Sequence, residues 1–147
     1  MNIQLKKDRS RVAHIALWVL QVLTAAAFLM AGFAKLSSQP MMVETFEKVG
    51  IGQWFRYVTG FIEIGSAMLL LVPRLTSVGA ALLVCTMTGA VLAHLLILGG
   101  SPVAALVLGC FAAVILWGRF ATVRAWFAFA RAPRAPVEAH MTLSGGR

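Results

Sequence analysis

One apolar stretch, Trp54 to Val72, limits most strongly what this chain can fold into. Its 19 residues match the roughly 20 that an α-helix needs to cross the hydrocarbon core of a bilayer. Glu63 lies in its middle and Arg56 lies near its start. An Asp at the centre of such a helix costs on the order of 2.5 to 3.5 kcal/mol. Glu63 therefore needs a charged partner, a proton or a water-filled cavity.

The composition places the chain among membrane proteins. It is 60% hydrophobic and 12% charged, whereas soluble domains are about 45 to 50% apolar and about 25% charged. The net charge of +8 could indicate nucleic-acid binding, but the basic residues cluster at the ends of apolar runs, as membrane topology requires. We therefore expect an integral membrane protein that binds lipids and no nucleic acid.

Four long apolar runs predict four membrane-spanning helices, at about residues 12–34, 54–72, 76–98 and 102–117. The first run is longer than the roughly 7 to 15 residues of a signal-peptide core, so we expect it to be retained. Two tight turns and one longer connection join the runs, which predicts an all-α, antiparallel four-helix bundle over residues 12–118. In the longer connection, Pro40 favours the start of a short amphipathic helix at the membrane interface, and Gly50 favours its end.

The positions of Lys and Arg predict the orientation of the bundle. Ten of the 13 Lys and Arg residues lie on the side that holds both termini, whereas the other side holds Lys35, Lys48 and Arg56. The positive-inside rule then makes both termini cytoplasmic, and we expect a multi-pass protein of a bacterial inner membrane. The flanking segments are a basic N-terminus (1–11), a basic amphipathic segment (119–131) and a disordered tail (132–147).

The ionisable residues within the spans all fall in the outer half of the predicted bundle. At 1.5 Å per residue, Glu63 lies about 13 Å and His94 about 6 Å below the outer ends of their helices, and Lys35 ends the first span. Lys35 and Arg56 could point inward to Glu63 or outward to water, and the sequence leaves both possibilities open. We therefore expect an outer-half polar pocket. Its candidate residues are Lys35, Arg56, Tyr57, Thr59, Glu63 and His94.

Several of these residues also have an ordinary structural interpretation. Lys35 and Arg56 fit interfacial anchors, and Tyr57 fits the aromatic belt at a membrane surface. His94, and Gln21 near the middle of the first run, fit hydrogen bonds between helices.

The remaining motifs predict packing and no metal chemistry. Cys85 and Cys110 lie inside apolar runs without CxxC spacing, so we expect two packing cysteines and no metal site. Ala105, Gly109 and Ala113 recur every four residues. This spacing permits close approach of helices within the bundle or between copies in a homo-oligomer.

Three short motifs resemble the DoxX-like family of small four-helix membrane proteins. They are Gly32-Phe-Ala-Lys35-Leu36, Gly60-Phe-Ile-Glu63-Ile-Gly65 and His94 of the third run, and the resemblance covers about residues 12–118. It implies that Lys35, Glu63 and His94 occupy the family's recurring polar positions, whereas helix geometry alone singles out Arg56. Relatives include a membrane subunit of a thiosulfate:quinone oxidoreductase, proteins linked to redox homeostasis and a receptor assembly factor.

These relatives leave two functions open. In the first, the pocket binds a quinone or lipid-like molecule in a redox-linked system: Glu63 and His94 exchange protons or hydrogen bonds with its head group, and Lys35 and Arg56 hold the carboxylate's charge. In the second, the chain is a non-enzymatic assembly subunit, and Glu63 hydrogen-bonds a partner helix. The sequence carries no haem-ligand pair across two helices, CxxC motif or nucleotide loop, so we expect no intrinsic cofactor and at most a quinone from outside. Whether the chain is itself catalytic stays open.

Overall fold

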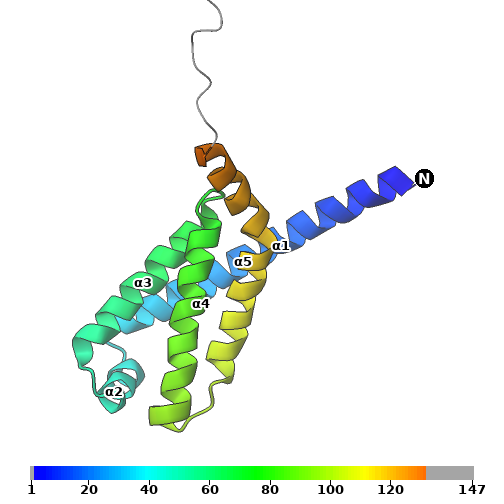
Figure 1. The fold of residues 1–147 in the computed structure, drawn as a ribbon. Helices are drawn as coiled ribbons and strands as arrows, with labels where there is room; N and C mark the ends of the chain where they lie inside the picture. Colours follow the sequence, from blue (N-terminus) through cyan, green and yellow to red (C-terminus); the bar gives the residue numbers. More distant parts are fainter. Residues whose placement is uncertain (1, 132–147) are drawn as a thin grey trace, which may run out of the picture.

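The computed structural model describes the backbone of residues 2–131 and the side chains of residues 12–120. Helices make up almost all of this part (Figure 1). They are α1 (Asn2–Leu36), α2 (Pro40–Val49), α3 (Gln53–Leu71), α4 (Thr76–Ala93), the π-helical turn η1 (His94–Leu98) and α5 (Val103–Arg131). No strand occurs within residues 2–131, which confirms the predicted all-α class. The predicted disordered tail, 132–147, lies outside the described residues.

Within the described residues, three helical segments are long and apolar enough to cross a membrane: Val12–Leu36, Thr76–Leu98 and Val103–Phe120. The sequence predicts four such spans, but by length and mean hydropathy α3 does not qualify as one. α3 has 19 residues, but Gln53, Arg56 and Glu63 make it more polar than the others. Arg56 and Glu63 are buried, and α3 packs against both α1 and α4. These two charged side chains are therefore covered by protein.

The two terminal helices are longer than the predicted spans. α5 continues without interruption to Arg131, so residues 119–131, expected as a separate segment, extend the last helix. α1 begins at Asn2 and includes the basic N-terminal segment. Figure 1 shows the N-terminal part of α1 extending away from the other helices.

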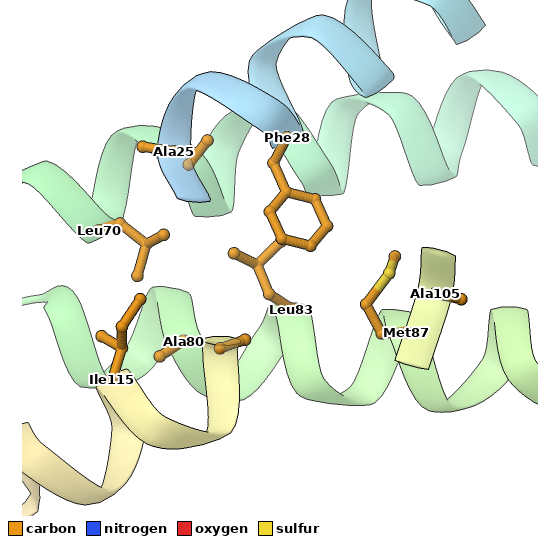
Figure 2. Close-up of a cluster of buried hydrophobic side chains, with 10 residues drawn as sticks. Ala25, Phe28, Leu70, Ala80, Leu83, Met87, Ala105 and Ile115 are labelled. Atoms are coloured by element: carbon orange, nitrogen blue, oxygen red, sulfur yellow. The ribbon is translucent and has the colours of Figure 1, made fainter. Parts of the chain in front are cut away.

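The helices pack mainly in chain order, α1 on α3, α3 on α4, and α4 on α5. α1 crosses α4 and α5 obliquely (Figure 1) and meets α5 where Leu17 contacts Gly118. Figure 2 shows the apolar core between them, in which Phe28 of α1 points toward Leu83 of α4. The buried members of this core are Ala25, Phe28, Ala67, Leu70, Ala80, Leu83, Met87, Ala105, Ala112 and Ile115.

The predicted short helix between the first two spans is confirmed as α2. It begins at Pro40, and Gly50 ends it in the left-handed conformation, with φ of 78°. Phe46 is its one buried residue and packs against Phe55 of α3, with ring centroids 6.0 Å apart. On the exposed side, Lys48 donates a hydrogen bond to Glu44 and holds the pKa of Glu44 below its usual value. α2 contacts α3 and η1, so it covers the end of the bundle at which α1 ends.

Candidate functional site

Two glycines bring α1 and α3 into backbone contact. A Cβ atom added to Gly32 would lie 2.7 Å from Ile64 Cγ1 and 2.9 Å from the carbonyl oxygen of Gly60. A Cβ atom on Gly60 would lie 3.2 Å from the carbonyl oxygen of Gly32 and from Lys35 Cβ. Gly32 therefore has no room for a larger residue, and Gly60 has little. The close approach places Lys35 of α1 beside the turn of α3 that leads to Glu63.

Lys35 and Glu63 form an ion pair between the two helices. Lys35 Nζ lies 3.0 Å from Glu63 Oε1 and 2.8 Å from Oε2. The glutamate is 1% exposed, whereas the lysine side chain is 15% exposed. Because side chains in a helix lean toward its N-terminus, the lysine stem reaches from the level of Gly60 to Glu63, one turn along α3. Of the two orientations that the sequence left open for Lys35, the structure has the inward one.

Arg56 points into the bundle but does not pair with Glu63. Its Nη1 donates to the carbonyl oxygen of Lys35, its Nη2 donates to Ser38 Oγ at 3.0 Å, and its Nε donates to Gln53 Oε1 at 2.8 Å. At 2% exposed, it caps the C-terminal end of α1, where a cation is favourable because the helix dipole is negative there. Arg56 therefore fixes the backbone at Lys35 and does not neutralise the carboxylate.

Tyr57 and Thr59 lie near the site without bonding to its ion pair. Tyr57 Oη lies 3.2 Å from Ser38 Oγ, and its ring lies 4.3 Å from the Arg56 guanidinium carbon. Ser38 has a positive φ of 55°, so these contacts hold the turn after α1 in a conformation that is uncommon for serine. Thr59 Oγ1 donates to the carbonyl oxygen of Arg56 within its own helix, at 2.9 Å. Tyr57 therefore supports the turn after α1, and the Thr59 hydroxyl bonds within its own helix.

His94 lies at the start of the π-helical turn that ends α4. Its Nδ1 is buried and has no hydrogen-bond partner among the described residues. A Cβ atom on Gly100 would lie 3.5 Å from this nitrogen, so the ring faces the loop before α5. The carbonyl oxygen of His94 accepts a hydrogen bond from the Gly99 N–H, at 3.0 Å. No hydrogen bond joins His94 to Glu63 within the described chain, although α2 connects η1 and α3 at this end of the bundle.

A second polar cluster, which the sequence did not predict, lies at the opposite end of the bundle. Gln21 is fully buried; its Nε2 donates to the carbonyl oxygen of Leu70 and lies 3.5 Å from Thr76 Oγ1. Arg119 Nε donates to Gln21 Oε1 at 3.2 Å, and the Arg119 carbonyl accepts from Ser77 Oγ at 3.3 Å. The cluster ties α1 and α5 to the turn between α3 and α4. The hydrogen bond between helices expected for Gln21 is present, level with the end of α3.

The fold and the site define a class: small helical membrane proteins in which a lysine of the first helix pairs with a buried glutamate of a neighbouring helix. The chain belongs to the DoxX-like family, whose model matches residues 19–119. The matched region contains Lys35, Glu63 and His94, and the predicted family assignment is confirmed. The chain matched no curated protein and no solved structure.

Proposed function

We propose that this protein binds the polar head of a quinone or lipid-like molecule at the Lys35 end of the bundle. In this proposal it acts within a redox-linked system of a bacterial inner membrane, and a partner protein supplies the electrons. The partial exposure of Lys35 is the observation that carries the proposal. Its side chain is 15% exposed, whereas that of Glu63 is 2% exposed, so an incoming head group meets the lysine first.

The chemistry of the ammonium group supports this role. A lysine has three N–H donors, and hydrogen bonds to Glu63 Oε1 and Oε2 occupy two of them. The third can donate to a carbonyl or hydroxyl oxygen of a ligand. Hydrogen bonds from charged donors are roughly twice as strong as neutral ones, so such a contact would help to hold the polar head of a quinone or lipid.

The other residues of the site take supporting roles in the proposal. Glu63 is a positioning residue, since it holds the lysine amine in place and balances its charge. Arg56 positions Lys35 from the other side through the lysine carbonyl oxygen. The unpartnered Nδ1 of His94, at the same end of the bundle, would exchange a proton or a hydrogen bond with the ligand.

The geometry of Glu63 weighs against the second function, in which Glu63 of an assembly subunit hydrogen-bonds a partner helix. A partner helix would have to reach a carboxylate that is 1% exposed and whose two oxygens already accept hydrogen bonds from Lys35. A partner helix would first have to displace the residues that cover Glu63, whereas a ligand can reach Lys35 directly.

Binding of a short-chain ubiquinone analogue to the full chain in lipid nanodiscs tests the proposal by calorimetry. We expect Lys35→Met to weaken binding about tenfold or more, since a hydrogen bond to a charged group contributes about 1.5 to 3 kcal/mol. Lys48→Met is the matched control, because Lys48 also pairs with a glutamate, on the exposed face of α2, and should leave the affinity unchanged. Equal affinities of the wild-type protein and a folded Lys35→Met variant would refute the proposal.

A further inference from the structure

Arg119 has more donors than the second polar cluster uses. A guanidinium carries five N–H groups, and the Nε of Arg119 donates to Gln21. Its Nη2 is buried and has no hydrogen-bond partner among the described residues. A buried donor without an acceptor is unfavourable, and more so when it belongs to a charged group. Nη2 itself is enclosed by protein, whereas Nη1 has no hydrogen bond among the described residues and is not enclosed. The N–H groups of Nη1 are therefore open to an acceptor from outside the chain, and a phosphate oxygen suits a guanidinium donor.

The Arg119 guanidinium lies next to an apolar groove on α1. Its central carbon is 5.5 Å from the centre of the Trp18 ring, and Trp18 lines the groove with Val19, Val22 and Leu23. The groove has a volume of about 280 Å³. Its three aliphatic residues are 50 to 64% exposed, so the groove is open along the outside of the bundle.

The position of this groove along α1 corresponds to a membrane surface. Trp18 precedes Lys35 by 17 residues, which is about 25 Å along a helix, close to the roughly 30 Å thickness of a hydrocarbon core. If Lys35 lies at one interface, Trp18 and Arg119 therefore lie near the other. Tryptophan is typical of the head-group level, and lipid phosphates lie at that level.

We propose that Arg119 and this groove together bind one anionic phospholipid. The phosphate accepts hydrogen bonds from Nη1 of Arg119, and an acyl chain lies along Val19, Val22 and Leu23 toward the membrane centre. Trp18 separates the polar part of the site from the apolar part. Gln21 is a positioning residue, since it holds the guanidinium through Nε and is itself fixed by Leu70. The site is at the opposite end of the bundle from Lys35 and is independent of the function proposed above.

Native mass spectrometry of the full chain in detergent tests this site. The probes are phosphatidylglycerol and phosphatidylcholine with identical acyl chains, added separately at increasing concentrations. We expect one phosphatidylglycerol molecule to bind with at least tenfold higher affinity than phosphatidylcholine. Inorganic phosphate at millimolar concentration should not displace it, because the acyl chain contributes to binding. Equal affinities for the two lipids, or displacement by free phosphate, would overturn the proposal.

Two variants and one control locate the lipid. Arg119→Gln should weaken phosphatidylglycerol binding tenfold or more. Arg74→Gln removes the same charge from the exposed turn at the same end of the bundle and should weaken it by about fivefold or less, the effect of one surface cation. Val22→Phe fills the groove, leaves the Arg119 contacts in place, and should also weaken binding. Equal losses in the two arginine variants, or unchanged binding in Val22→Phe, would show that the lipid does not occupy this site.

Discussion

The Lys35–Glu63 pair makes an asymmetric prediction about stability. At 2.8 Å and an effective dielectric constant of about 20, two unit charges attract by about 6 kcal/mol, much of which desolvation offsets. Lys35→Met leaves a carboxylate that is 2% exposed without its partner, and such a loss typically costs about 3 to 5 kcal/mol. Glu63→Gln keeps an oxygen that can accept from the lysine, and Lys35 is exposed enough to extend toward water. We expect Glu63→Gln to lower the free energy of unfolding by only about 1 to 2 kcal/mol.

Reversible unfolding in mixed detergent micelles, followed by circular dichroism, measures these free energies. The double variant should be more stable than Lys35→Met by at least about 1 kcal/mol, because it no longer buries an unpaired charge. Lys48→Met again serves as the control, since the exposed Lys48–Glu44 pair should contribute no measurable stability. Additive effects of the two single substitutions, or a larger loss for Glu63→Gln than for Lys35→Met, would refute this interpretation of the pair.

Three further predictions concern packing and polar contacts, and the same unfolding measurement checks each. Gly32→Ala should destabilise by about 1 to 3 kcal/mol through overpacking, whereas Gly65→Ala, whose added Cβ meets nothing within 4 Å, should not destabilise; equal effects would contradict the close contact of α1 and α3. Arg56→Lys should lose stability nearly as much as Arg56→Ala, because a single ammonium cannot replace three differently directed N–H donors; full rescue by lysine would show that only the charge matters. Gln21→Leu should cost about 1 to 3 kcal/mol by leaving the Leu70 carbonyl and Arg119 without their partner, and an unchanged stability would mean that water replaces the amide.

Much of the architecture follows from the sequence because long apolar runs have few alternatives. Helix formation satisfies the backbone groups of a segment in lipid, so the apolar runs predict helices, and Pro40 and Gly50 mark the ends of α2 as observed. The sequence predicts the Lys35–Glu63 contact as one of two orientations of Lys35, inward to Glu63 or outward to water, since a carboxylate in an apolar run requires a partner. The orientation of Lys35 depends on how closely α1 and α3 approach each other. Gly32 and Gly60 permit this close approach, but the sequence does not show that these two helices pack together.

Other features depend on contacts that sequence spacing does not encode. Arg56 lies seven residues before Glu63 on nearly the same helix face, which made it a candidate partner, but the end of α1 offers it carbonyl and hydroxyl acceptors. The π-helical turn at His94 has no evident sequence signal. Arg119 follows the last predicted span, and the sequence predicts it as part of a basic amphipathic segment. Only the folded chain brings it to Gln21, 98 residues away.

The two polar clusters together determine how α1 and α3 align. Between them lies an apolar core in which residues such as Phe28 and Leu83 make non-directional contacts, and in lipid the hydrophobic effect adds little to helix association. A slip of one turn would move α3 by about 5.4 Å along α1, which would separate Lys35 from Glu63 and also Gln21 from Leu70. Both losses would occur at once, at opposite ends of the helices. The polar clusters therefore favour one register, together with the close contact of Gly32 and Gly60.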